Sequence, residues 1–266
     1  MNKLFITVVL FIISSSVHAL ELKGTFEQGS FILGETKPGS EVVVDDRKVK
    51  VSKDGFFAFG LSKDRKNNVL IKVTKNKKME IFEKKVFKKK YKIQKIDGLP
   101  ENKVTPPKEV YERIKRENKI IGDARLVESN LTFFKDKFIN PLDNALITGV
   151  YGSQRILNGK PKWPHYGLDF AAKEGTKIKA MLDGSATMVE PDMFYTGGTV
   201  IFDHGHGVST LYMHMKDIYV QKGQIVKKGE TIGTVGSTGR STGAHLDVRL
   251  NWFDVRLDPA SVLENE

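Results

Sequence analysis

Short apolar runs separated by turn residues fill the first half of the chain. Glu41 to Val44 and Arg47 to Val51 flank two aspartates, which is the pattern of a tight β-hairpin. Phe56 to Phe59 and Val69 to Val73 continue the series at roughly ten-residue spacing. We predict a small β-sandwich domain over residues 20–96, which contains no histidine and no recognisable catalytic constellation.

A Thr-Pro-Pro sequence at residues 105–107 then breaks the strand pattern. Threonine can cap a helix, and proline is well placed in a first helical turn. Beyond it, apolar residues recur at helical spacing among charged ones: Val110, Ile114 and Ile121. The pattern predicts an amphipathic helix over residues 106–128, solvent-facing on one side, in a linker of residues 97–140.

The last part of the chain, residues 141–266, combines short β-branched runs with glycine. Sixteen of the 24 glycines lie after residue 140, where strands must turn. The predicted strands lie at Thr176 to Met181, Ala186 to Val189, Thr199 to Phe202, Ser209 to Met213, Thr231 to Val235 and Ala244 to Leu250. We therefore predict an all-β protein, in which a connecting helix joins a small sandwich to a Gly-rich antiparallel β-sheet domain.

The N-terminus has the pattern of a secretory signal peptide over residues 1–19. Lys3 precedes an apolar run from Leu4 to Ile13, and Val17 and Ala19 fit a small-x-small cleavage site. An uncleaved membrane anchor is the alternative, although the apolar run is short for a span of ~20 residues. We expect a periplasmic or secreted protein.

The composition of the chain limits the kinds of site and partner that it can have. The chain has no cysteine, which excludes disulfides, a thiol nucleophile and Cys-ligated metal sites. Its net charge of +11 is concentrated in residues 20–120, which hold 26 Lys and Arg against 15 Asp and Glu. Export argues against a nucleic-acid partner, so this basic half is predicted to attract anionic envelope material. A merely solvated Lys-rich surface is the alternative, and the sequence does not indicate an oligomeric state.

Candidate chemistry is confined to the Gly-rich domain, where five of the six histidines lie. His165 and Asp169 are four residues apart, His214 directly follows a predicted strand, and His245 and Asp247 are two apart in another. Residues two apart in a strand point to the same face. Such side chains can provide the three nitrogen and oxygen ligands of a hydrolytic zinc. His204 and His206, in a Gly-rich turn, are interpreted as turn and surface residues.

These motifs, in this order, resemble the lysostaphin-like (LytM-type) zinc peptidase family of cell-wall endopeptidases over roughly residues 146–260. The resemblance rests on His165-x-Gly-x-Asp169, on Tyr-Met-His214 and on a long Gly-Ser-Thr-Gly-Arg-Ser-Thr-Gly-Ala-His245-Leu stretch. It implies that His165 and Asp169 bind zinc, and that His214 and His245 are catalytic. It also implies an oxyanion-stabilising role for Tyr195.

One position departs from the family pattern. The second histidine of the closing His-x-His motif, a zinc ligand, is replaced by Asp247. Asp can ligate zinc, but a His, Asp, Asp set leaves the metal with no net charge where the usual set leaves one positive unit. The bound water would then be less acidic, and other divalent metals would be better tolerated.

The resemblance implies an exported zinc metalloendopeptidase that hydrolyses peptide bonds of peptidoglycan, with peptidoglycan peptides as its partners. In this mechanism one of His214 and His245 takes the proton of the water, and the other stabilises the oxyanion. The sequence leaves their order open. Two alternatives also stay open: a noncatalytic peptidoglycan-binding or hydrolase-activating factor, and an adaptor that acts through the basic sandwich.

Overall fold

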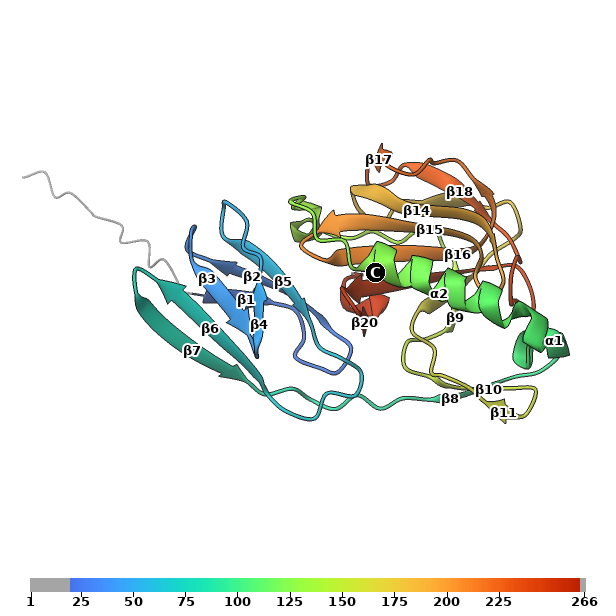
Figure 1. The fold of residues 1–266 in the computed structure, drawn as a ribbon, viewed down its shortest axis with the longest axis horizontal. Coiled ribbons are helices and arrows are strands. Elements are labelled where there is room, and N and C mark those ends of the chain that lie inside the picture. Colours follow the sequence, from blue (N-terminus) through green and yellow to red (C-terminus); the bar gives the residue numbers. More distant parts are fainter. Residues whose placement is uncertain (1–19, 264–266) are drawn as a thin grey trace, which may run out of the picture.

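A computed structural model describes residues 20–263 of the chain, and the predicted signal peptide lies outside these residues. The described part is mostly β-sheet, with antiparallel pairing in all strand pairs except β8 with β10 (Figure 1). The predicted all-β class is therefore confirmed. Within residues 20–263 no helix is long and apolar enough to cross a membrane.

The N-terminal part is a sandwich of two small sheets. One sheet has the order β1-β2-β5, from strands Leu20–Lys23, Phe31–Thr36 and Phe56–Gly60. The other has the order β4-β3-β6-β7, from strands Arg47–Val49, Glu41–Val44, Val69–Lys75 and Lys78–Lys84. Strand β8 (Ile93–Ile96) does not join either sheet. It pairs instead with β10 of the C-terminal part.

The linker contains two short helical segments and one longer helix: α1 (Glu101–Val104), a 3-10 turn (Lys108–Val110) and α2 (Tyr111–Arg125). A second 3-10 turn covers Phe133–Lys135. The long helix begins later and ends earlier than the predicted range of 106–128. It packs Ala124, Ile120 and Ile121 against Met188 and neighbouring side chains of the large sheet.

The C-terminal part is built on a sheet with the order β17-β14-β15-β16-β19-β12-β9. Its strands are Ile225–Val226, Gly184–Met193, Gly197–Gly205, Val208–Ile218, His245–Trp252, Leu168–Ala171 and Leu146–Gly149. Strands β13 (Lys177–Lys179), β18 (Thr231–Val235) and β20 (Val255–Leu257) extend it. A small separate sheet of β11 (Lys160–Pro161), β10 (Gln154–Leu157) and β8 lies beside it, and a last 3-10 turn covers Pro259–Ser261.

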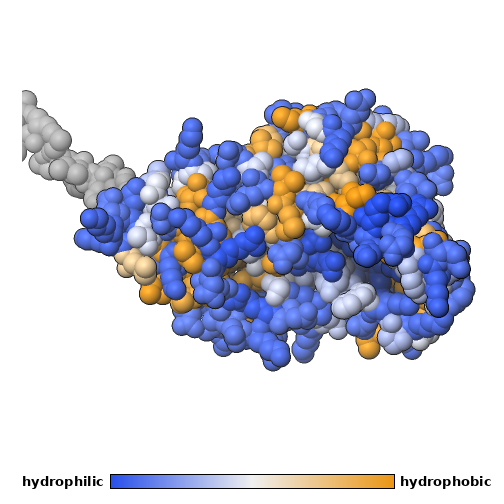
Figure 2. Space-filling model, in the orientation of Figure 1, coloured by the Kyte–Doolittle hydropathy of each residue, from blue (hydrophilic) through white to orange (hydrophobic). Residues whose placement is uncertain are grey.

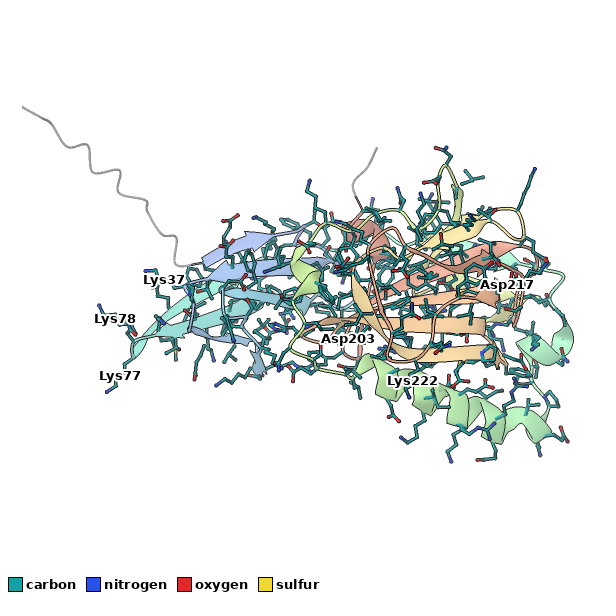
Figure 3. All side chains as sticks on the ribbon, turned by 90° about the horizontal axis from the view of Figure 1, so that it is seen from above. Lys37, Lys77, Lys78, Asp203, Asp217 and Lys222 are labelled. Carbon is teal, nitrogen blue, oxygen red and sulfur yellow. The ribbon has the colours of Figure 1, made fainter. Side chains whose placement is uncertain are left out.

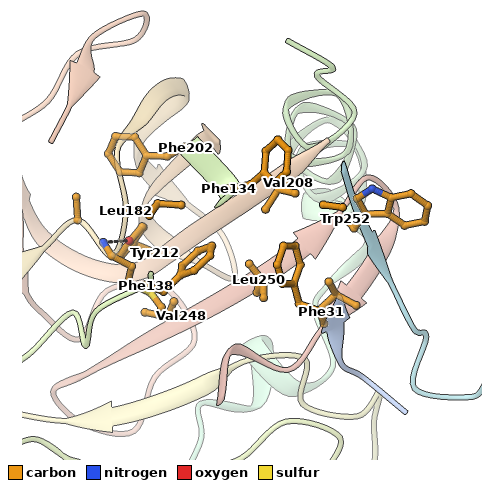
Figure 4. Close-up of a cluster of buried hydrophobic side chains, with 14 of the residues drawn as sticks. Phe31, Phe134, Phe138, Leu182, Phe202, Val208, Tyr212, Val248, Leu250 and Trp252 are labelled. Carbon is orange, nitrogen blue, oxygen red and sulfur yellow. Dashed lines mark hydrogen bonds between the residues drawn. The ribbon is translucent and has the colours of Figure 1, made fainter. Parts of the chain in front are cut away.

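One buried apolar cluster runs through both halves. Phe31 of the sandwich lies against Phe138 of the linker, with ring centroids 6.3 Å apart, and near Leu250 and Trp252 of the large sheet (Figure 4). Within the sheet domain, the Tyr212 hydroxyl accepts a hydrogen bond from the Met181 amide. The sandwich is therefore packed onto the sheet domain and not merely tethered to it.

The surface of the sandwich is rich in lysine. Lys37, Lys77 and Lys78 lie at the end of the sandwich that points away from the large sheet (Figure 3). The face seen in Figure 2 is mostly hydrophilic, with apolar areas between the polar ones. This is the basic half that the charge distribution predicts.

Candidate metal centre

Strand register brings two carboxylates together. In the antiparallel pair β12–β19, Asp169 lies directly opposite Asp247. His165 comes from the loop before β12, where its amide donates to the Ser153 carbonyl at 2.8 Å. Its Nε2 atom lies 3.0 Å from Asp169 Oδ1 and 3.2 Å from Asp247 Oδ2. All three side chains are buried, and the structure therefore gathers the three predicted ligands into one cluster.

Two glycines make room for these carboxylates. A Cβ atom on Gly149, which pairs with Asp169 from β9, would lie 2.1 Å from Asp169 Oδ2. A Cβ atom on Gly167 would lie 2.1 Å from Asp247 Oδ1. Real Cβ atoms do not approach so closely, so neither position accepts a side chain without displacing a carboxylate.

Each carboxylate also faces its own arginine. Arg155 Nη2 lies 2.6 Å from Asp169 Oδ2, and Arg249 Nη2 lies 3.2 Å from Asp247 Oδ2. Like charges directly opposite each other on paired strands destabilise a sheet, and more so when buried. The two guanidinium groups offset that repulsion. Neither arginine is among the site residues predicted from the sequence, although Arg249 is two residues from Asp247 and therefore on the same strand face.

The charges of the cluster shift its protonation equilibria. Burial by itself lowers the pKa of His165, but the nearby Asp247 and Asp169 outweigh it and raise that pKa. Burial and repulsion from Asp247 raise the pKa of Asp169. His165 and Arg155 lower it by more, so the pKa lies below its ordinary value. Burial also raises the pKa of Asp247, and Arg249 with His165 brings it well below the ordinary range. Both carboxyl groups are therefore held in the ionised form that a metal requires.

The donor set fits a small divalent cation. Two ligands on a tetrahedral zinc with bonds of ~2.0–2.1 Å are separated by about 3.3 Å, close to the 3.0 and 3.2 Å found here. Asp169 Oδ1 is buried and lies 3.0 Å from His165 Nε2, but among the described residues it accepts no well-aligned hydrogen bond. Buried polar atoms rarely lack a partner. An ion at this point would supply it.

Two further histidines lie beside the cluster, with ring centroids 4.7 Å apart. His214 Nδ1 lies 2.8 Å from the Thr238 carbonyl, and His245 Nδ1 lies 2.9 Å from the Gly243 carbonyl. A carbonyl only accepts, so each Nδ1 carries the proton and each Nε2 is left as the acceptor in the neutral ring. Burial and the nearby His245 lower the pKa of His214 to about 4.

The backbone at His214 adopts a left-handed conformation, with φ of +62°. This conformation is uncommon for a residue other than glycine and costs free energy. The His214 amide donates to the Thr196 carbonyl at 2.8 Å, which helps to hold the residue there. Strain of this kind gathers at functional sites, where surrounding contacts maintain it.

A cleft of about 260 Å³ opens over the cluster. Asp169, His214 and His245 line it together with Arg155 and Arg240. Gln94, Ile96 and Leu99 form part of its wall, so the segment that leaves the sandwich contributes to the site. No site residue in that segment is predicted from the sequence, because nothing local indicates that β8 pairs with β10.

Tyr195 is not part of the cleft lining. Its ring lies 4.4 Å below the guanidinium of Arg240, which does line the cleft. The structure therefore gives Tyr195 a contact with Arg240 and leaves its oxyanion role a prediction.

The interpretation of His204 and His206 as surface residues is wrong. His204 is fully buried, with Nδ1 2.7 Å from the Asp183 carbonyl and Nε2 2.8 Å from the Thr210 hydroxyl. His206 lies in the turn but packs on Phe134, with ring centroids 4.7 Å apart. The linker covers this turn, and that contact is not visible in the local sequence.

Comparison with known proteins agrees with the geometry. The sequence model of Peptidase family M23 matches residues 163–259, which confirms the resemblance noted from the motifs. A crystal structure of a candidate peptidase M23 from Pseudomonas aeruginosa is similar over 90% of this chain and 95% of that one. It has 27% sequence identity and a TM-score of 0.64.

Curated relatives match the same region. The DD-carboxypeptidase/endopeptidase Mpg of Neisseria meningitidis is 44% identical over 100 residues, which are 37% of this chain and 22% of that protein. The peptidoglycan DD-endopeptidase ShyC of Vibrio cholerae is 34% identical over 127 residues, 46% of this chain and 28% of that protein. The first relatives are thus matched over only about a fifth of their own length.

Proposed function

We propose that this chain, which carries a domain of peptidase family M23 over residues 163–259, is an exported metal-dependent endopeptidase that hydrolyses peptide bonds of peptidoglycan. The observation that supports this most is the buried cluster of His165, Asp169 and Asp247 at a cleft that His214 and His245 also line. The relatives' names, which mention peptidoglycan endopeptidases, support the substrate class.

His165, Asp169 and Asp247 would hold the metal, with zinc the first choice and another divalent ion tolerated because two of three donors are carboxylates. When bound, the metal supplies a Lewis acid that lowers the pKa of water from ~15.7 toward ~7. Arg155 and Arg249 keep the carboxylates ionised and oriented.

His214 and His245 would divide the proton transfer. Each presents an unprotonated Nε2, because its Nδ1 donates to a backbone carbonyl. The lowered pKa of His214, about 4, keeps that ring neutral at physiological pH. We therefore assign His214 to accept the proton at Nε2 and to pass it to the leaving amine. His245, which is half-buried, is assigned to stabilise the oxyanion in its doubly protonated form, in which Nε2 carries a proton and can donate a hydrogen bond.

The proposal is tested on purified peptidoglycan, with new amino groups measured in the presence of zinc and in the presence of a chelator. We expect amine release that depends on metal, together with about one equivalent of bound zinc per chain. His165→Ala should lose both metal and activity. His214→Ala and His245→Ala should retain metal and lose activity. Lys222→Gln, in an exposed turn, is the control and should match the parent.

Each outcome separates the alternatives. Metal-loaded protein that binds peptidoglycan without releasing amines would indicate a noncatalytic binding or activating factor. Protein that holds no zinc, with an intact fold, would favour an adaptor. Digestion at the parent rate by His214→Ala would refute the assignment of the proton acceptor.

A further inference from the structure

Arg240 occupies a conspicuous position in the cleft. It lies in the segment between β18 and β19 and lines the same cleft as Asp169, His214 and His245. The side chain is half-buried. A cation therefore stands beside the groups to which we assign the reaction.

The position of this guanidinium is fixed by its surroundings. It stacks over the Tyr195 ring at 4.4 Å, and the Arg240 amide donates to the Tyr195 carbonyl at 2.8 Å. Within residues 20–263, the guanidinium itself makes a single long hydrogen bond of 3.4 Å, from Nη1 to the Lys103 carbonyl. Most N–H donors of this guanidinium are therefore held in place without an acceptor among the described residues.

Arg240 differs in this respect from the two other arginines near the site. Arg155 and Arg249 are paired with Asp169 and Asp247. Among residues 20–263, no carboxylate lies within ion-pair distance of Arg240. Burial lowers the pKa of Arg240, which reflects the cost of removing an unpaired cation from water.

An anion from outside the chain would offset that cost. The planar fork of a guanidinium binds carboxylates through two parallel hydrogen bonds, and such charge-assisted bonds are stronger in a partly desolvated cleft. Under the proposed function, the molecule that enters the cleft is a peptide, and the anion that a peptide brings is a carboxylate.

A second polar group in the cleft complements Arg240. Gln94 of β8 lines the same cleft, and its Oε1 atom is buried without a hydrogen-bond partner among the described residues. An amide oxygen accepts a backbone N–H. Arg240 and Gln94 together can therefore fix the direction of a bound peptide.

We propose that Arg240 forms a carboxylate-binding subsite, which selects peptides that carry a free carboxylate near the bond to be cleaved. This inference rests on the proposed function and narrows its substrate class. The carboxylate can be the C-terminal one of the peptide or one on a side chain.

The test compares the full chain and Arg240→Gln on three forms of one synthetic cross-linked stem peptide. One form has all carboxylates free, one is amidated at the C-terminus, and one is amidated on the side chain. For the parent, we expect one amidated form to show a KM about tenfold to a hundredfold higher, with a smaller change in kcat. Which form is affected identifies the carboxylate. Arg240→Gln should process all three with similar KM values.

Two further variants complete the design. Arg240→Lys keeps the charge without the fork, so a reduced preference is expected, and it substitutes for the glutamine variant if that fails to fold. Arg116→Gln, at an exposed position of α2, should keep the parent's preference.

Equal KM values for the three forms in the parent, or an unchanged preference in Arg240→Gln, would overturn the inference while leaving the endopeptidase proposal intact. If the parent cleaves none of the peptides, the proposed function fails. Calorimetric binding of the same three peptides then decides the subsite: discrimination lost in Arg240→Gln supports it, and no discrimination by the parent overturns it.

Discussion

Replacing Asp247 by histidine introduces the residue that the family resemblance implies at this position, and it tests how Asp247 balances the charges around it. The change removes a carboxylate that lies 3.2 Å from Arg249 Nη2. Attraction between unit charges at that distance is about 1 kcal/mol in water and about 5 kcal/mol at an effective dielectric constant of ~20. The Arg249 side chain is 26% exposed, which places the true value between these limits.

Removal of Asp247 also relieves its repulsion with Asp169, its partner across the two strands. This relief is worth up to about 1 kcal/mol. We therefore expect Asp247→His to lower the free energy of unfolding of the metal-free protein by about 2 kcal/mol. For a chain of this size, that corresponds to a fall in Tm of about 4–8 °C.

A double-mutant cycle with Arg249→Gln measures this coupling directly. Thermal unfolding is recorded in chelator for the parent, both single variants and Asp247→His/Arg249→Gln. The double variant should regain most of the lost stability, because no unpaired guanidinium is left behind. Asp247→Asn, which keeps the shape of the side chain, should lose about as much stability as Asp247→His. Additive effects in the cycle would refute the pairing of Asp247 with Arg249.

The same variants report on catalysis. If the proposed metal binds, Asp247→His raises the net charge of the metal and its ligands by one unit, so zinc affinity should rise and the lower limb of the pH–rate profile should move down. An active parent supports the enzyme proposal on its own. A silent parent with an active Asp247→His variant would mean that Asp247 disables the site.

Three other predictions follow from the geometry. Gly167→Ala should reduce zinc affinity in a binding titration and destabilise the fold by about 1–3 kcal/mol, because its Cβ meets Asp247, whereas Gly122→Ala in open space on α2 should not. His204 has a pKa lowered from 6.5 to about 4. His204 therefore takes up a proton below about pH 6.5 in the unfolded chain but only below about pH 4 in the folded protein. The free energy of unfolding falls as the pH is lowered from 6.5 to 4. Chemical unfolding measures the free energy of unfolding at pH 7 and at about pH 4.5. The decrease between the two pH values should be smaller in His204→Gln than in the parent by about 2–3 kcal/mol. Binding of the full chain to anionic lipid vesicles should weaken sharply with added salt, since exposed charges are screened within ~8 Å at physiological ionic strength; salt-independent binding, or none, would favour a solvated surface.

Local sequence was sufficient for the fold class and for the identity of the candidate ligands. Alternating apolar runs and glycine turns are short-range signals, and they predicted the strands of both halves. The motifs around His165, His214 and His245 are also local, so the sequence alone indicates that these residues belong to one site. The departure at Asp247 could likewise be found in the sequence alone.

Only the tertiary structure determines how these residues are arranged and which groups offset their charges. The register that places Asp169 opposite Asp247 depends on contacts between strands about eighty residues apart in the chain, and alternation within one strand does not specify it. The same holds for β8, which looks like a further sandwich strand but pairs with β10 and forms a wall of the cleft. His204 is buried for the same reason: linker residues that are remote in sequence cover it. The candidate ligands can thus be named from local pattern, whereas pairing, burial and the partners of each charge depend on long-range packing.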